Sequence, residues 1–283
     1  MLDTHAHIYD SSLIKNDLTL RYVPTESALK KEYRYCCEPN GISGCIYVQP
    51  SFLKYDNRYL LNSLKKDSEE GTFKTFGVAV LEPLITESDL DYLSGAGVLG
   101  IRLNLICKSD SDINELLDKN ITLIKMIGKH NMHLELHIES QRLMKILDKV
   151  VSYVDKIVVD HFALPAEGQN GRINKEPDIY RKLKKYSSLD KIWIKTSGAY
   201  RVVPNASFNE AVKDCTILAR ALADFMPQNH LLWGSDWPYT MNNQKVDGNT
   251  ALEKYKSIFS TYGIWSDNGN LYNSDSAFAQ LIK

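Results

Sequence analysis

The chain has 283 residues, of which 43% are hydrophobic and 24% are charged, values typical of a globular protein and unlike those of a disordered one. Lys and Arg number 34 and Asp and Glu number 35, so the formal net charge is −1. This balance gives no electrostatic reason to expect a nucleic acid or an anionic membrane surface as a partner. No apolar run approaches the roughly 18–20 residues that a membrane span needs.

The N-terminus has neither the basic nor the apolar region of a signal peptide. The five cysteines are odd in number and lack C-x-x-C spacing, which suggests neither a disulfide framework nor a thiolate zinc site. We therefore expect a reduced, cytoplasmic protein.

Eight short apolar stretches rich in β-branched residues predict eight strands. They fall at Met1–His7, Ser43–Gln49, Phe73–Leu81, Val98–Leu103, Met132–Ile138, Lys156–His161, Lys191–Thr196 and His230–Gly234. Several of them are nearly continuous apolar runs, which is typical of buried parallel strands because both faces of such a sheet are covered.

A stretch with helical periodicity follows each predicted strand. The clearest helices are Asp112–Lys129, Ser140–Val154 and Ser207–Phe225, and further helix starts fall at Asp56-Asn57 and Thr86–Asp89. Eight such alternations are the pattern of an α/β fold of the (β/α)8 TIM-barrel type, which needs roughly 250 residues. We therefore expect one barrel domain over residues 1–283.

The alternative fold is an open doubly wound sheet, which usually carries a glycine-rich phosphate-binding turn after its first strand. Here the first strand runs into Thr4–Tyr9, which contains no glycine. The barrel is therefore favoured.

Candidate catalytic groups lie at the predicted strand ends, where a parallel barrel places its chemistry. His5 and His7 are two residues apart at the end of the first strand, so both side chains face the same side. His137 and His161 each end a further strand, and Asp236 follows the last one. A lone histidine at a strand end is more often a packing residue, but this combination at one rim indicates a functional site.

The other three histidines have simpler structural interpretations. His130 is expected at a helix end, and His133 and His230 at the starts of strands. We assign them no part in the site.

Arg102 and Arg201 also lie at strand ends. Burying a guanidinium group is costly unless it is paired. One natural partner is a substrate carboxylate, which the guanidinium grips with two hydrogen bonds. The other is an internal carboxylate such as Asp3 or Asp236, and the sequence leaves both pairings open.

Neutral polar groups accompany the arginines. Gln49 ends the second predicted strand and Ser51 lies just after it, and Asn104 follows Arg102 at the end of the fourth. We expect all three to contribute hydrogen-bond donors and acceptors to a bound substrate.

Several of these segments resemble the amidohydrolase superfamily, and within it the amidohydrolase family 2 branch that holds 2-pyrone-4,6-dicarboxylate lactonases and sugar-acid lactonases. The matching segments are Asp3–His7, Val48–Ser51, Asp56-Asn57, Gly100–Asn104, Val159–Pro165, Lys195–Arg201 and Trp233–Pro238. They occur in the order of the family and span most of the chain.

The resemblance implies a distorted barrel with a hydrolytic site at its C-terminal rim. It implies that Asp236 is the general base that activates water, and that His5, His7 and His161 surround the carbonyl under attack. The two arginines match carboxylate-binding residues of the family.

The resemblance leaves the metal content open at His137. The pyrone lactonases work without metal and have what looks like a tyrosine at this position. Other members of the superfamily have a histidine there and bind one divalent ion, which here implies His5, His7, His137 and Asp236 as ligands. Three imidazoles and a carboxylate suit Zn²⁺ or Mn²⁺, and a metal-free mechanism is equally compatible with the sequence.

These features predict a lactonase that opens a small carboxylated or sugar-acid lactone, a small anionic or hydroxylated molecule. One alternative is a metal-dependent decarboxylase of an unsaturated or aromatic acid, and another is a non-catalytic barrel with a binding role. A deaminase is disfavoured, because Glu139 lacks an assignable spacing as its general acid. The sequence is also compatible with a homo-oligomer.

Overall fold

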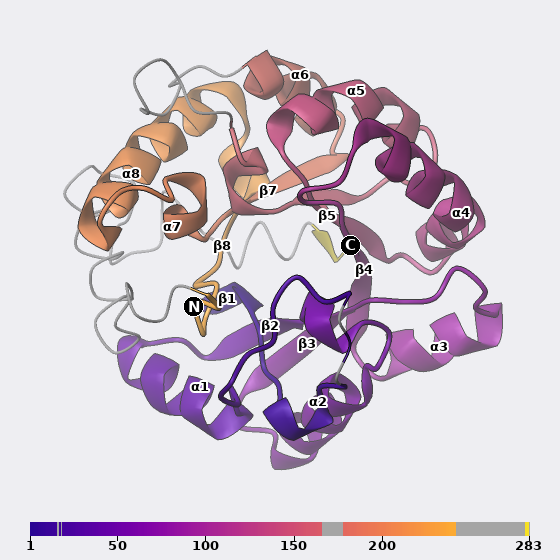
Figure 1. Ribbon diagram of the computed structural model, residues 1–283, viewed down its shortest axis with the longest axis vertical. Coiled ribbons are helices and arrows are strands. Elements are labelled where there is room, and N and C mark those ends of the chain that lie inside the picture. The colour runs from indigo at the N-terminus through magenta and orange to yellow at the C-terminus, as the bar shows by residue number, and fades with distance from the viewer. Residues whose placement is uncertain (16, 18, 166–177, 242–280, 283) are drawn as a thin grey trace.

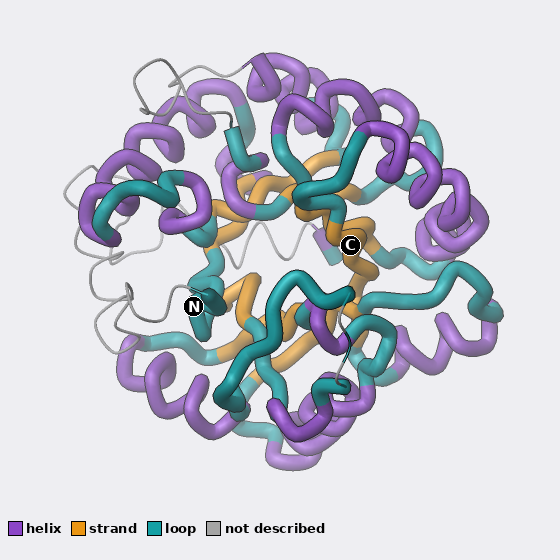
Figure 2. The backbone as a smooth tube through the Cα atoms, viewed as in Figure 1, coloured by secondary structure: helices purple, strands orange, loops and turns teal. Residues whose placement is uncertain are grey.

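In the computed structural model, residues 1–15, 17, 19–165, 178–241 and 281–282 are described. Within them, eight strands lie in chain order in one sheet, and every neighbouring pair is parallel. Figure 1 shows this sheet curled around a central axis with the helices outside it, and Figure 2 separates the inner strands from the outer helices by colour. The predicted barrel is confirmed, and the open-sheet alternative is wrong.

The strands are short and nearly all buried. Their bounds are β1 Leu2–Ala6, β2 Gly44–Val48, β3 Lys74–Ala79, β4 Val98–Asn104, β5 His133–His137, β6 Ile157–Val159, β7 Ile192–Thr196 and β8 Leu231–Trp233. One boundary differs in a way that matters for function. His161 does not end a strand as predicted, because β6 stops at Val159 and a turn begins.

Helices follow β1 to β7, as the periodicity predicts, and both α7 and α8 follow β7. The stretch in which a helix after β8 is predicted falls mostly in residues 242–280, which lie outside the described residues. Their bounds are α1 Lys30–Cys37, α2 Arg58–Glu70, α3 Glu87–Gly95, α4 Asp110–Lys129, α5 Ser140–Val151, α6 Asp178–Ser187, α7 Ala199–Val202 and α8 Phe208–Phe225. Thr86, Ser109 and Ser207 cap α3, α4 and α8 with reciprocal hydrogen bonds to an acidic residue three positions on. The caps explain why these helices begin where they do.

The main core fills the space between the helices and the sheet. In α5, for example, Leu143, Ile146, Leu147 and Val150 are buried on one face, as the spacing of three and four residues requires. His230 lies on the ring of Trp193, with 4.7 Å between ring centroids, so its structural interpretation is supported.

The barrel closes between β1 and the segment that follows β8. The backbone N–H of His7 donates to Trp237 O at 2.7 Å, and that of Asp236 donates to His5 O at 2.8 Å. A Cβ at Gly234 would lie 2.6 Å from the Cβ of His5, so glycine is needed for this close approach. Closure therefore brings residues more than 220 positions apart to one rim.

The sequence also predicts a loop at the glycine-rich, polar segment Gly168–Lys175 and a core position for Trp265, and both lie outside the described residues. Among the described helices, none is long and apolar enough to cross a membrane.

Candidate active site at the barrel rim

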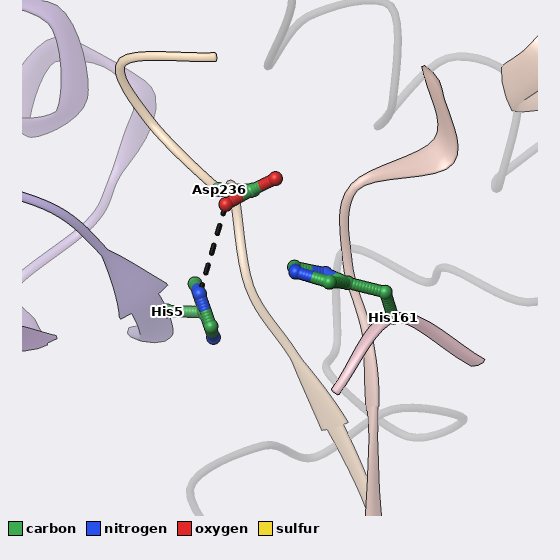
Figure 3. A group of neighbouring side chains, drawn as sticks. All are labelled: His5, His161 and Asp236. Carbon is green, nitrogen blue, oxygen red and sulfur yellow. Dashed lines mark ion pairs between the residues drawn. The ribbon is translucent and has the colours of Figure 1, made fainter. Parts of the chain in front are cut away.

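Three donor atoms meet where β1 and β8 come together. His5 Nε2 lies 3.3 Å from His7 Nε2 and 3.6 Å from Asp236 Oδ1, and His7 Nε2 lies 3.5 Å from the same oxygen. His5 and Asp236 are fully buried and His7 is nearly so. Figure 3 shows His5 and Asp236 in contact, with the ring of His161 directed at the space beside them.

The local structure orients His7 toward this group. Its Nδ1 lies 2.8 Å from Val48 O. Because a carbonyl oxygen only accepts, Nδ1 carries the proton, and Nε2 presents a lone pair to the site. The strand period of two then aligns His7 with His5, as predicted.

Asp236 uses its two carboxylate oxygens differently. Tyr200 Oη and Arg201 Nε donate to Oδ2 at 2.5 and 2.6 Å, whereas the buried Oδ1 has no hydrogen-bond partner. Burial acts to raise the pKa of Asp236, but the Arg201 charge outweighs it and holds that pKa well below its usual range. The carboxylate is therefore ionised at neutral pH, with Oδ1 available.

His161 opens a turn of unusual conformation, the 3₁₀ segment η4 (His161–Ala163). The φ angles of residues 161–164 are all positive, between 39° and 60°, which is costly for residues other than glycine and often accompanies a functional site. Ser197 Oγ lies 2.9 Å from His161 Nδ1, and the buried Nε2 has no partner. Burial lowers the pKa of His161 to about 3, so the ring is neutral.

Gly198 makes room for this arrangement. Its φ is +61°, and a Cβ there would lie 2.7 Å from His161 Nδ1 and 3.0 Å from Asp236 Oδ2. Both the conformation and the space therefore call for glycine.

His137 ends β5 as predicted, but it lies outside the three-atom group. Its ring packs edge-on against His161 with 5.0 Å between centroids, and its buried Nδ1 has no partner. Burial lowers the pKa of His137 well below its usual range. Of the four predicted metal ligands, the structure brings His5, His7 and Asp236 into mutual contact.

The three atoms are spaced as the ligands of one divalent ion. A point equidistant from atoms at these separations lies about 2.0 Å from each, which matches Zn–N and Zn–O bond lengths. His161 is near enough to join, since donor atoms of His5, His161 and Asp236 all lie within 4.8 Å of one another. The residues therefore fit a metal ion.

Both predicted arginines have internal carboxylate partners. Arg102 Nε and Nη2 donate to Asp160 Oδ2 at 3.0 and 2.7 Å, and Arg201 Nε donates to Asp236. The partner of Arg102 is thus neither Asp3 nor Asp236. Asp3 instead accepts hydrogen bonds from Tyr33 Oη and from Ser235 beside the barrel seam.

Two adjoining cavities open at this rim. The first, of about 440 Å³, is lined by Arg102, Ser51 and Asn104 among others. The second, of about 420 Å³, is lined by His137 and Arg201 among others. Both are within the size range of small-molecule sites.

The positions of Gln49 and Arg21 differ from what the sequence analysis expects of a substrate pocket. Gln49 is buried and its Nε2 donates to Asp56 O at 2.8 Å, so it braces the loop after β2. Arg21, from the loop between β1 and α1, lines both cavities. Nothing in the sequence singled out Arg21, because loop residues carry no periodicity.

A buried ionic cluster lies next to His5 inside the barrel. Lys195 Nζ donates to a Glu135 carboxylate oxygen, lies 3.1 Å from His5 Nδ1 and lies 3.9 Å from Asp160 Oδ1. Arg102 joins through Asp160, and no member exceeds 4% exposure. Burial and Asp160 both act to raise the pKa of Glu135, but Lys195 and neighbouring histidines hold it at about 2.

The sequence analysis missed this cluster, although a signal was present. Glu135 alternates with leucines in β5, and Lys195 interrupts an apolar run in β7. A charged residue within a buried strand requires a buried partner.

With this geometry in place, known proteins identify the family. The amidohydrolase family model matches residues 2–257. The chain belongs to the amidohydrolase family. Among its relatives, 4-sulfomuconolactone hydrolase of Rhizobium radiobacter is 25% identical over 241 residues, covering 84% of this chain and 75% of the relative.

A second family relative, the 2-pyrone-4,6-dicarboxylate hydrolase of Comamonas testosteroni, is 26% identical over 248 residues, covering 84% of this chain and 76% of that protein. A crystal structure from Pseudomonas putida, assigned as a 2-pyrone-4,6-dicarboxylic acid hydrolase, is 30% identical with a TM-score of 0.81, and the match covers 99% of this chain and 96% of that one. These similarities confirm the branch of the family that the sequence motifs resemble.

Proposed function

We propose that this amidohydrolase opens the lactone ring of a small carboxylated or sugar acid. The observation that carries the proposal is the position of Asp236, whose unpartnered Oδ1 faces His5 and His7 in a buried rim. The names of both curated relatives describe hydrolases, one of a muconolactone and one of a pyrone dicarboxylate, which supports this substrate class.

In the proposed reaction, Asp236 Oδ1 takes a proton from water as the water oxygen attacks the lactone carbonyl. The ring C–O bond then breaks, and the departing oxygen receives that proton, which leaves a hydroxy acid. Because the pKa of Asp236 is low, its effectiveness as a base depends on position within hydrogen-bond reach of the water.

His161 is proposed as a donor to the oxyanion. If Ser197 Oγ donates to its Nδ1, the neutral ring carries its proton on Nε2, the buried atom that has no partner. One such donor is commonly worth about 3 kcal/mol in the transition state.

A Zn²⁺ or Mn²⁺ ion would be held by His5, His7 and Asp236, with His137 as the proposed fourth ligand. Such an ion, when bound, lowers the pKa of water to about 7 and polarises a carbonyl. Without a metal, the Nε2 atoms of His5 and His7 lie within hydrogen-bond distance of each other, and Asp236 Oδ1 is left to act on water.

The cavities suit an anionic substrate. Arg21, Lys54, Arg102 and Lys108 line the first cavity, and Arg201 lines the second beside His137. We propose that Arg102 and Arg201 bind substrate carboxylates with the N–H groups that their internal partners leave free. Ser51, Asn104 and Gln49 are proposed as neutral substrate contacts, with Gln49 acting through the loop that it braces.

Replacement of Asp236 by Asn tests the proposed base. Hydrolysis of 2-pyrone-4,6-dicarboxylate and 4-sulfomuconolactone is measured with and without Zn²⁺ or Mn²⁺. We expect Asp236→Asn to lower kcat/KM by about 10²–10⁴-fold with an unchanged circular dichroism spectrum. The exposed Asp178 provides the matched control Asp178→Asn, which is expected to keep full activity.

Wild-type rates in Asp236→Asn would remove the base assignment. If the wild-type protein instead releases CO₂ from unsaturated or aromatic acids and opens no lactone, the decarboxylase alternative replaces the proposal.

We further propose a cytoplasmic location, supported by the cysteine pattern.

A further inference from the structure

His5 has close neighbours at both of its ring nitrogens. Nε2 faces the rim, at His7 and Asp236. Nδ1 faces the barrel interior, where Lys195 Nζ lies at 3.1 Å and Asp160 Oδ1 at 3.3 Å. A neutral imidazole carries one proton, so its position decides whether Nε2 offers a lone pair to the rim.

With the proton on Nε2, the contact between His5 and His7 is a hydrogen bond that needs no cation. Lys195 donates to the lone pair of His5 Nδ1 at 3.1 Å. His5 Nε2–H then points at His7 Nε2, which must accept because Val48 O holds the His7 proton on Nδ1. Lys195 therefore stabilises a form of His5 that cannot ligate a metal through Nε2.

With the proton on Nδ1, the arrangement reverses. Nδ1–H donates to Asp160 Oδ1, a buried oxygen that otherwise has no hydrogen-bond partner. The lone pairs of His5 and His7 then face Asp236 Oδ1 at separations of 3.3 to 3.6 Å. Three electron-rich buried atoms at such distances repel one another unless a cation lies among them.

Asp160 thus occupies the place of the carboxylate that usually accepts the second N–H of a metal-binding histidine. Lys195 competes with it for the same ring nitrogen. The ammonium also explains why His5, Glu135 and Asp160, whose donor atoms lie within 4.8 Å of one another, need no metal of their own. Lys195 already supplies the cation there.

We propose that Lys195 and Asp160 set the metal affinity of the rim by competing for Nδ1 of His5. Lys195 favours the metal-free tautomer, and Asp160 favours the metal-binding one. Both are positioning residues, since they act through His5. The inference rests on the proposed rim metal site but is independent of the lactone substrate.

The tautomer of His5 can be measured directly in the intact wild-type protein. Nitrogen-15 spectra of histidine-labelled protein distinguish a protonated from an unprotonated ring nitrogen, and His5→Gln identifies the His5 signals by their loss. We expect the proton on Nε2 after treatment with a chelator and on Nδ1 after addition of Zn²⁺. A proton on Nδ1 in the zinc-free protein would overturn the proposal.

Zinc affinity, measured by competition with a chromophoric chelator, tests the two competitors. The charge-balanced variant Lys195→Met/Glu135→Gln is expected to bind Zn²⁺ about tenfold more tightly than the control Glu135→Gln, which keeps the Lys195–His5 contact. Asp160→Asn is expected to weaken binding by about 10–100-fold. Equal affinities of the double variant and its control would overturn the role of Lys195.

These outcomes are separable from those of the proposed function. Lactone hydrolysis with no tautomer change on zinc addition would reject the inference and leave the lactonase standing. If the expected tautomers and zinc affinities are found but no lactone is hydrolysed, the lactonase proposal is rejected and the inference about His5 stands. Should the double variant not fold, the wild-type spectra alone decide the matter.

Discussion

His5 separates two buried polar regions that differ in how completely their groups are paired. In the interior, Lys195 and Arg102 face Glu135 and Asp160, and every charge has an opposite charge within 4 Å. At the rim, His161 Nε2 and Asp236 Oδ1 have no hydrogen-bond partner. The interior also has carboxylate oxygens without a hydrogen-bond partner, Glu135 Oε1 and Asp160 Oδ1, but Arg102 or Lys195 lies within 4 Å of each. Asp236 Oδ1 instead faces the two imidazoles of His5 and His7. The interior therefore supplies its own cations, whereas the rim is arranged for a ligand.

The largest effect is expected from breaking the interior. Lys195→Met leaves the buried Glu135 without its main cation, and removing one partner of a buried pair typically costs about 3–5 kcal/mol. The loss is measured as the free energy of unfolding in urea. The balanced variant Lys195→Met/Glu135→Gln should recover much of it, and a loss below about 1 kcal/mol in Lys195→Met would show that the interior is not maintained by pairing.

The dependence of stability on pH tests whether the rim histidines are neutral in the folded protein. Burial lowers the pKa of His5 to about 4, with Lys195 adding to the effect, and that of His161 to about 3, below the unfolded value of about 6.5. The neutral, buried histidines therefore contribute fully to the free energy of unfolding above about pH 6.5. That contribution is lost as pH falls toward their folded pKa values, because in this range the unfolded chain takes up protons and the folded one does not. Two such groups give a decline of at most about 2.7 kcal/mol per pH unit, which is approached near pH 5.

Burial lowers the pKa values of His133 and His137 too, so they steepen the same decline. The measurement is urea unfolding at several pH values. His161→Asn should reduce the slope by about 1.4 kcal/mol per pH unit. An unchanged slope in that variant would mean that His161 is charged in the folded protein.

Gly198→Ala tests whether the rim depends on the close packing of the backbone against His161. The new Cβ adds a clash with His161 to the cost of a positive φ, together about 1–3 kcal/mol, and kcat/KM should fall at least tenfold. Gly71 has a φ of +67° and open space around it, so Gly71→Ala is the matched control. It should lose some stability and no activity, and equal activity losses would exclude a local effect at His161.

The smallest effect is expected at Ser197. Ser197→Ala removes the hydrogen bond to His161 Nδ1, worth about 1 kcal/mol, and should lower kcat/KM roughly fivefold through loss of ring orientation. Ser63, which bonds only to the backbone within α2, provides the control Ser63→Ala. Equal rates in the two variants would show that His161 needs no orienting partner.

The sequence predicted the barrel well because its signals are local. The apolar run of β6 and the periodic face of α5 depend on residues a few positions apart, and so do the caps of α3 and α8. The His5–His7 pair was predicted for the same reason, since a strand alternates its side chains over two residues.

Other parts of the site could not be predicted from the same signals. The left-handed turn at His161 has no glycine to announce it, and the strand prediction therefore ran two residues too far. The tyrosine that contacts Asp236, Tyr200, lies in a helix of only four residues. Propensity over so short a segment carries little information.

The sequence by itself determined the architecture and the types of chemistry, namely imidazoles, carboxylates and guanidinium groups at strand ends. Only the tertiary structure decided their partners. Arg102 pairs with a residue 58 positions away and Lys195 with His5 at a separation of 190. The reason is physical: side-chain alternation follows from backbone geometry within one strand, whereas an ion pair across the barrel exists only after the sheet has closed and excluded water.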